Sequence, residues 1–313
     1  MSVVVTGGLG FIGSHLVDAL LGYSFPVTVI DDARSGLVTR AELWPDSPSV
    51  TVLMADCSYV RKLPPWVEPE AVFHLASPVG PVGVLSQAGR ITRDIIEGAM
   101  VAADWAARAR VPLIYVSTSE VYGGGDRGLC SETMPRIVEA GAWARLEYQT
   151  AKLAAEVMLL NRTDVDVRII RPFNVAGPRQ SPAGGFVLPR FIAQGLAGQP
   201  LTVYAPGSQK RALTHVADIV DGIWRAWRCG QPNRDYNLGN PGNTCSIMQL
   251  AEEVAAATGA PGIEVVDPTR LHGDEFREAA EKFPDATRAI TELGWSPQRS
   301  RADIIAETVA WAR

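Results

Sequence analysis

A tyrosine and a lysine, Tyr148 and Lys152, lie four residues apart in a segment typical of a helix. One helical turn would place the phenol and the ammonium on the same face. Such a tyrosine could take the proton from a substrate hydroxyl while a hydride leaves the same carbon, provided that its pKa lies well below about 10. We expect Lys152 to lower that pKa, because a nearby cation favours the phenolate. The spacing alone also fits a surface helix that carries both residues.

Two more polar residues, Thr118 and Glu120, follow a predicted strand over residues 112–116. The Thr118 hydroxyl could hydrogen-bond the same substrate oxygen as Tyr148, or it could satisfy backbone groups at the end of the strand. Glu120 could serve as an acid or base on the neighbouring carbon, or it could be a solvated carboxylate in a turn. The chemistry of Tyr148 therefore has two candidate helpers.

A glycine-rich turn near the N-terminus predicts where a cofactor for this chemistry would bind. An apolar run over residues 2–6 leads into Gly7, Gly10 and Gly13, and residues 14–21 then show helical spacing. Glycines between a strand and a helix let backbone N–H groups approach a pyrophosphate at the helix N-terminus. The pattern predicts a dinucleotide site, and a strand, turn and helix without a cofactor is the alternative.

An acidic residue indicates which dinucleotide is bound. Asp31 ends a predicted strand over residues 27–30 and lies 18 residues after Gly13. At about that spacing a carboxylate accepts the ribose hydroxyls of NAD and repels the 2′-phosphate of NADP. We therefore predict NAD. Asp56, after the next strand, could hydrogen-bond the adenine amine or could cap a turn.

The elements that must position these residues alternate along the chain. Such alternation, with strands that end in polar residues, predicts an α/β fold with a Rossmann-type, doubly wound parallel sheet and ligands at its carboxyl edge. The predicted strands cover residues 2–6, 27–30, 50–54, 71–76, 112–116, 166–170 and 236–239, and the predicted helices cover residues 14–21, 87–109, 187–197, 216–224, 247–258 and 302–312 and the segment around Tyr148. His74, in an apolar strand, is expected to be a packed core histidine.

A change in composition predicts a second, smaller lobe. From Gly177 to Gly207 prolines and glycines interrupt the chain, as in a loop-rich segment laid over the sheet edge. We predict an NAD-binding Rossmann domain over residues 1–176 plus about 213–239. A C-terminal nucleotide-sugar-binding lobe is predicted over residues 177–212 and 240–313.

Composition limits the partners of this chain. Its 313 residues carry a net charge of −5, which argues against a nucleic acid or an anionic membrane surface as a partner. The four cysteines are scattered, so neither a disulfide framework nor a metal site is expected. No stretch approaches the roughly 20 apolar residues of a membrane span. We expect a cytoplasmic protein with a small-molecule partner.

Five stretches, residues 6–15, 74–76, 117–123, 148–152 and 171–178, together resemble the extended short-chain dehydrogenase/reductases that act on nucleotide sugars. Residues 185–204 and 209–218 resemble the nucleotide-binding lobe of that family. The resemblance implies bound NAD and a nucleoside-diphosphate sugar, with a UDP-sugar favoured, that is oxidised transiently at C4. It also implies a homodimer built from the helices that carry residues 91–106 and 148–160.

The resemblance assigns further residues to the site. The catalytic set is Thr118, Glu120, Tyr148 and Lys152. The cofactor set is Gly7, Gly10, Phe11, Ile12, Gly13, Asp31, Asp32, Arg34, Ser35, Asp56, Cys57, Leu75, Ala76, Ser77, Ser117, Tyr148, Lys152 and Pro172. The substrate set is Pro78, Asn174, Phe186, Val187, Arg190, Tyr204, Arg211 and Lys282, with Asn174 and Arg211 on the diphosphate and Phe186, Val187 and Tyr204 near the base and ribose.

Glu120 indicates the branch of the family, because the C4-epimerases usually lack an acid at this position. Residues 118–123 and 74–78 resemble UDP-glucuronic acid decarboxylases, and residues 209–211 and 239–243 resemble the decarboxylase that acts in aminoarabinose modification of lipid A. In that chemistry, oxidation at C4 makes the C6 carboxylate a β-keto acid, CO2 leaves, and an acid protonates C5.

One residue departs from the decarboxylase pattern. An arginine usually stands two residues before the proline of a Pro-Asp-Ile-like segment, whereas this chain has Lys282 before Phe283 and Pro284. Lysine offers a point charge where arginine binds a carboxylate bidentately. We therefore favour decarboxylation and keep a 4,6-dehydratase and a 4-epimerase as alternatives. A non-catalytic NAD-binding regulatory protein is the alternative from another class, although the chain retains Thr118, Tyr148 and Lys152.

Overall fold

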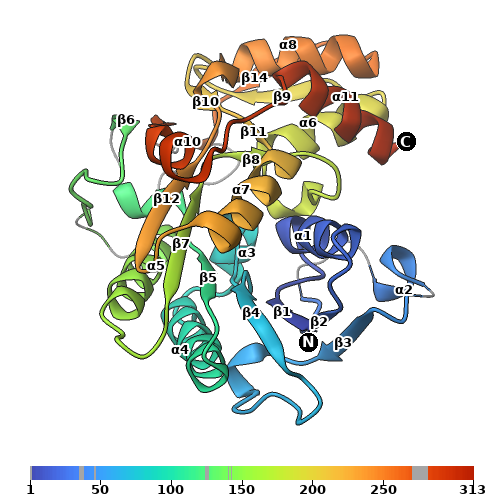
Figure 1. The fold of residues 1–313 in the computed structure, drawn as a ribbon. Helices are drawn as coiled ribbons and strands as arrows, with labels where there is room; N and C mark the ends of the chain where they lie inside the picture. The colour runs from blue at the N-terminus through green and yellow to red at the C-terminus, as the bar shows by residue number, and fades with distance from the viewer. Residues whose placement is uncertain are drawn as a thin grey trace.

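The computed structural model describes residues 2–34, 39–45, 47–123, 127–139, 141, 143–269 and 281–313. Its centre is a seven-stranded sheet in the order β12-β7-β5-β4-β1-β2-β3, with every neighbouring pair parallel (Figure 1). The strands are β1 (Ser2–Thr6), β2 (Val27–Asp31), β3 (Val50–Met54), β4 (Pro69–His74), β5 (Leu113–Val116), β7 (Val167–Pro172) and β12 (Arg234–Leu238). The predicted Rossmann-type doubly wound sheet is confirmed.

Both faces of this sheet are buried, which explains why its strands read as continuous apolar runs. Val3 and Val5 of β1 point into one hydrophobic cluster, and Val4 points into the other. Helices α1 (Phe11–Gly22) and α7 (Val216–Cys229) cover the first face, while α4 (Ile91–Ala109) and α5 (Ala144–Leu160) cover the second (Figure 1). The chain thus forms three layers.

The order of the strands reverses between β1 and β4, so the connections leave the sheet in opposite directions there. Ligands of doubly wound folds bind outside the carboxyl ends of the strands at this switch point. The glycine turn after β1 and the residues after β4 and β5 all lie at that edge. His74 ends β4 and is buried, with its Nδ1 2.8 Å from the Thr6 Oγ1. The expectation of a packed core histidine is confirmed.

A smaller group of elements has a hydrophobic cluster of its own, at the top of Figure 1. It contains α6 (Val187–Leu196), α8 (Ile247–Thr258), α11 (Arg301–Ala312) and the parallel pair β9 (Leu201–Tyr204) and β14 (Ile263–Val266). Helix α10 (Thr287–Leu293) packs instead into the cluster of the main sheet, together with Trp295. The domain boundaries given above stay a prediction.

Short elements, most of them outside the helices and strands predicted above, complete the described fold. Three two-stranded pairs join β6 (Gly128–Cys130) to β15 (Lys282–Pro284), β8 (Val175–Ala176) to β11 (Thr214–His215), and β10 (Lys210–Ala212) to β13 (Thr244–Ser246). The short helices are α2 (Arg40–Leu43), α3 (Gly80–Ser86), η1 (Cys57–Tyr59), η2 (Ser119–Tyr122), η3 (Pro182–Gly184) and η4 (Pro241–Asn243). Among the described helices, none has the length and apolar character needed to cross a membrane.

A buried ion network fixes α5 against the sheet. Arg171 on β7 is 0% exposed, and its guanidinium donates to both oxygens of Glu156 on α5 at 2.9 and 2.7 Å. It also donates to the Tyr122 hydroxyl at 2.9 Å and pairs with Asp235 of β12 at 2.7 Å. The network therefore joins the helix that carries Tyr148 to two strands of the sheet.

Replacing Arg171 by methionine should lower the free energy of unfolding by about 3–5 kcal/mol, because it leaves a buried carboxylate without its main cation. The nearest other cation of Glu156, Arg136, lies 4.0 Å away. Chemical denaturation measures the loss. The matched control is Arg162→Met, since its partners Asp104 and Asp164 have side chains that are 43% and 56% exposed and such pairs contribute about 0–1 kcal/mol. Equal losses in the two variants would contradict the prediction.

Candidate active site

The structure brings the predicted hydroxyl groups together around Tyr148. Tyr148 lies on α5 and is only 8% exposed, and the side chains of Thr118 and Ser77 lie near enough to its hydroxyl to lower its pKa. Thr118 lies two residues after the end of β5 and caps η2, because its Oγ1 accepts the Glu120 N–H at 3.2 Å. Ser77 was expected among the cofactor residues, and it also lies near the Tyr148 hydroxyl. The residues that follow β4 and β5 and one face of α5 therefore come together at the Tyr148 hydroxyl.

The expectation that Lys152 lowers the pKa of Tyr148 is wrong for this structure. Burial raises the pKa of Tyr148 above its ordinary value, and the negative charge of Glu120 raises it further, although the hydrogen bonds from Thr118 and Ser77 oppose this. The Lys152 ammonium points elsewhere, since its Nζ donates to the Val116 carbonyl oxygen at 2.9 Å and lies 4.9 Å from the centre of the Tyr115 ring. Helical spacing placed both residues on one face without determining where the amine hydrogen-bonds.

Lys152 is itself a perturbed group. Burial lowers the pKa of Lys152 to about 7, although the charge of Glu156 one turn later on α5 acts in the opposite direction. The side chain is held on a stacked pair of rings, because Tyr115 lies 5.7 Å from His74 with an interplanar angle of 13°. His74 stays neutral there, as burial lowers its pKa to about 3. This packing fixes the lysine beneath the catalytic edge.

Glu120 is held between two cations and is not a freely solvated turn residue. Arg145 donates to its Oε2 from Nε at 2.9 Å and from Nη2 at 2.8 Å, and the Lys282 Nζ lies 3.2 Å from its Oε1. Burial would raise the pKa of Glu120, but Lys282 and Arg145 outweigh it and hold that pKa below its ordinary value. Glu120 is therefore ionised in the free protein.

Lys282 reaches Glu120 because β15 pairs with β6, which follows Glu120 in the chain. The register places Lys282 opposite Gly128, and the Lys282 ammonium also donates to the Gly123 carbonyl oxygen at 3.1 Å. Its side chain is 6% exposed, and burial lowers its pKa, although Glu120 opposes this. The structure thus brings the residue that departs from the family pattern into contact with the candidate acid.

Arg145 is the residue of this cluster that sequence reasoning missed. It lies in the first turn of α5, three residues before Tyr148, so the helix presents both on neighbouring positions of one face. That spacing is the signal that could have identified it. The sequence alone did not show that its guanidinium turns toward Glu120.

The glycine turn forms a cradle that a β-carbon would fill. A β-carbon on Gly13 would lie 2.0 Å from the Gly7 carbonyl oxygen, and Gly7 has a φ of +71° that favours glycine. Helix α1 starts at Phe11 with Gly10 as its N-cap and no side-chain cap. Its first N–H groups are therefore available to a pyrophosphate, and Ile12 follows within the same turn. These residues fit a dinucleotide.

Asp31 connects the cradle to the end of β2. Its carboxylate accepts the Leu9 N–H at 2.9 Å and the Ala33 N–H at 2.7 Å. Burial is the main cause that raises its pKa, while these two hydrogen bonds lower it. The carboxylate lies at the carboxyl edge beside the glycine turn, where it could accept ribose hydroxyls.

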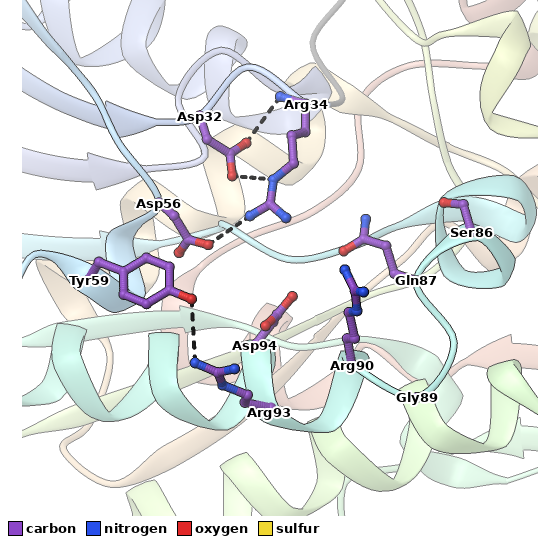
Figure 2. Close-up of a pocket in the computed structure, with 10 residues that line it drawn as sticks. All are labelled: Asp32, Arg34, Asp56, Tyr59, Ser86, Gln87, Gly89, Arg90, Arg93 and Asp94. Atoms are coloured by element: carbon purple, nitrogen blue, oxygen red, sulfur yellow. Dashed lines mark hydrogen bonds and ion pairs between the residues drawn. The ribbon is translucent and has the colours of Figure 1, made fainter.

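A cavity of about 580 Å³ begins at Asp32, the residue after Asp31, and is shown in Figure 2. Its lining includes Asp32, Arg34 and Asp56. Arg34 pairs with Asp32 and, at 2.7 Å, with Asp56, so the guanidinium bridges the ends of β2 and β3 (Figure 2). Asp56 also caps η1 by accepting the Ser58 N–H at 3.0 Å, so the cap role considered for it is present. The cavity has the position and polarity of an adenosine site.

The other predicted cofactor residues line the same edge or lie beneath it. Leu75 and Ala76 donate their N–H groups to Thr6 Oγ1, each at 3.2 Å. Ser117 is buried, and its Oγ has no hydrogen-bond partner among the described residues. Cys57 is buried behind Asp56, where burial raises the pKa of its thiol to about 12, and Pro172 lies in register with Leu238. Ser35 lies outside the described residues.

The predicted substrate residues are divided between the two groups of elements. Arg190 of α6 lies 4.3 Å from the centre of the Tyr204 ring, Asn174 donates to the Ala212 carbonyl oxygen at 3.3 Å, and Arg211 lies on β10. Phe186 caps α6 just before Val187, and a β-carbon on Gly80 would lie 2.8 Å from its ring. Gly80 starts α3 shortly after Pro78. The lobe therefore contacts the segment that leads from β4.

A family model described as the NAD dependent epimerase/dehydratase family matches residues 3–239. The chain belongs to this family. The predicted use of NAD is confirmed at the level of the family, and the predicted resemblance to nucleotide-sugar enzymes is confirmed as well.

Relatives of the chain carry more specific names. UDP-glucuronic acid decarboxylase 2 of Arabidopsis thaliana is 33% identical over 308 residues, which cover 96% of this chain and 65% of the relative. The chain therefore spans less than two thirds of that protein. UDP-N-acetyl-alpha-D-glucosaminuronate decarboxylase of Bacillus cytotoxicus is 30% identical and covers 99% of this chain and 97% of the relative. A solved UDP-glucose 4-epimerase of Thermotoga maritima, with UDP-glucose, superposes with a TM-score of 0.85 at 26% identity and covers 100% and 99% of the two chains.

Replacing Gly13 by alanine should weaken NAD binding by about tenfold or more, roughly 1.4 kcal/mol, because the new methyl group would displace the Gly7 carbonyl from the cradle. Titration of the cofactor-free protein with NAD measures the loss. Gly22→Ala at the end of the same helix is the matched control, since a β-carbon there meets nothing within 4 Å. Unchanged NAD affinity in Gly13→Ala would remove this turn from the cofactor site.

The lowered pKa of Lys152 predicts a pH dependence of stability. An unfolded lysine, with a pKa of about 10.4, binds more protons than the buried Lys152 between pH 7 and 10, so the free energy of unfolding rises with pH in this window. The Lys152→Met variant lacks this contribution. The stability difference, wild type minus variant, should therefore grow by about 2 kcal/mol from pH 7 to 9 in urea denaturation of the cofactor-free protein. Lys62→Met, at an exposed lysine, is the control, and the same trend in both variants would contradict the assignment.

Proposed function

We propose that this chain is an NAD-dependent UDP-glucuronic acid decarboxylase that forms UDP-xylose or a UDP-4-keto-pentose. The observation that carries the proposal is the Glu120 cluster, in which Arg145 and Lys282 hold one carboxylate two residues after Thr118. An epimerase that only oxidises and reduces C4 has no use for an acid and two cations at the neighbouring carbon. The names of the two decarboxylase relatives support the same reaction.

In the proposed reaction, different residues of the chain act at C4 and at the neighbouring C5 of the sugar. Bound NAD would accept a hydride from C4; the hydride would return to the sugar if UDP-xylose is the product and would stay on the cofactor if the 4-keto-pentose is released. Tyr148 is proposed to take the proton of the C4 hydroxyl, with Thr118 hydrogen-bonding the same oxygen and Lys152 holding the cofactor next to β5. Because burial raises the pKa of Tyr148 in the free protein, this role requires that the pKa fall when cofactor and substrate are bound. When the C5–C6 bond breaks, its electron pair stays at C5 and CO2 leaves. Glu120 is the proposed acid that gives a proton to C5.

The substrate lobe is proposed to hold the nucleotide. Asn174 and Arg211 are assigned to the diphosphate, because a positively charged guanidinium and an amide donor suit phosphate oxygens. Phe186, Val187, Arg190 and Tyr204 are assigned to the base and ribose, and Pro78 to the sugar. The stacking of Arg190 on Tyr204 supports a flat, preformed surface for a base.

The assembly is proposed to be a cytoplasmic homodimer that pairs α4 and α5 of two copies. Both helices expose apolar side chains away from the sheet, Met100 at 45% and Val157 at 55%. Burying these side chains between two copies would remove apolar area from water.

Purified protein incubated with UDP-glucuronate and NAD should yield a UDP-sugar that is lighter by one CO2 if UDP-xylose forms, or by one CO2 and two hydrogens if the 4-keto-pentose is released, as followed by mass spectrometry. A new isomer of unchanged mass would identify an epimerase and overturn the proposal. Loss of water from a UDP- or dTDP-hexose would identify a dehydratase. No reaction with any of these sugars would favour the non-catalytic NAD-binding protein.

The Tyr148→Phe variant is the companion test. It should retain NAD and lose substrate-driven reduction of that NAD by at least about 100-fold, because the proton acceptor is absent. The absorbance of the reduced cofactor follows this step directly. Unaltered turnover would remove Tyr148 from the mechanism.

A further inference from the structure

The Glu120 cluster contains two cations and one carboxylate. In the part of the chain that the structure describes, neither Arg145 nor Lys282 makes an ion pair with any other acid. The described site therefore carries an uncompensated positive charge beside the hydroxyl pair of Tyr148 and Thr118. A second carboxylate would neutralise it.

The two cations differ in how firmly they are held. Lys282 is 6% exposed and is fixed by the Gly123 carbonyl oxygen as well as by Glu120. Arg145 has a side chain that is 40% exposed, and its recorded partner is Glu120 alone. Arg145 is thus the cation that an entering ligand can reach and turn.

The chemistry of the guanidinium suits such an exchange. A planar guanidinium binds a carboxylate through two parallel N–H groups, which an ammonium cannot do. Arg145 already binds the Glu120 carboxylate through Nε and Nη2. Because Arg145 lies one turn before Tyr148 on α5, a sugar whose C4 oxygen meets Tyr148 would carry its C6 carboxylate toward the same helix face.

We propose that Arg145 exchanges carboxylates: it pairs with Glu120 in the free protein and with the C6 carboxylate of the sugar in the complex. This inference rests on the proposed decarboxylase function and names the residue that recognises its uronate substrate. Once Arg145 leaves, Glu120 retains Lys282 alone and lies beside a second negative charge, so it takes up a proton from solvent. That proton moves to C5 when the C5–C6 bond breaks and CO2 leaves, and Arg145 then returns to Glu120.

The test compares a ligand that has the carboxylate with one that lacks it. The affinities for UDP-glucuronate and UDP-glucose are measured by calorimetry in the Tyr148→Phe background, which prevents turnover. Adding Arg145→Gln should weaken the binding of UDP-glucuronate by about 10- to 100-fold, which is the range for loss of a charge-assisted hydrogen bond. The affinity for UDP-glucose should change by less than about threefold. Arg145→Lys should recover part of the loss. Arg162→Gln, an arginine with ion pairs remote from the site, should change neither affinity.

Equal losses for both ligands, or no loss for UDP-glucuronate, would overturn the exchange. Thermal unfolding shows whether Arg145→Gln is folded. If that variant does not fold, the two affinities are compared in Arg145→Lys instead. The outcome for the proposed function is separate. If the wild-type protein releases no CO2 from UDP-glucuronate, that function fails and this inference fails with it. If the wild type decarboxylates and Arg145→Gln keeps its preference for the uronate, only the exchange is wrong.

Discussion

The ion pair between Arg171 and Glu156 is the constraint on which the geometry of the site depends. Both side chains are closed to water, and such a pair is stable only when its partners are oriented so that every charge is satisfied. Glu156 lies on α5, the helix that also presents Tyr148 and Lys152 at intervals of one turn. A shift of α5 along the sheet would move Tyr148 and would also pull Glu156 away from Arg171, so the buried pair opposes such a shift. The position of the Tyr148 phenol thus depends on an ion pair beneath the sheet edge.

Much of the fold was predictable because its signals are local. The unbroken apolar runs of β1 and β2 are expected for strands of a sheet that is covered on both faces. The glycines after β1 are needed because the backbone segments of the turn approach one another too closely to leave room for a β-carbon. Asp31 was predictable for the same reason, since its place at the end of β2 is set by strand length and topology. Tyr148 and Lys152 were placed on one face by helical spacing alone.

What the sequence could not supply was the direction in which polar side chains turn. Lys152 hydrogen-bonds the Val116 carbonyl oxygen and not the phenol, a choice made by packing over Tyr115. Arg145 carried no motif of its own, and its contact with Glu120 depends on the path of the chain before α5. The short strands β8 and β10 were missed because elements of two or three residues have no periodicity to detect.

The pairing of β15 with β6 has a consequence for how such enzymes can diverge. A strand of three residues delivers Lys282 to Glu120 from a segment far along the chain, while the glycine turn, Asp31 and Tyr148 belong to other elements. On the proposed function, exchanging that one strand would change a charge beside Glu120 and leave the glycine turn, Asp31 and Tyr148 in place. Glu120 and Arg145 themselves lie beside Thr118 and Tyr148 in the chain, so β15 is the part of this cluster that can change without altering α5 or the segment after β5.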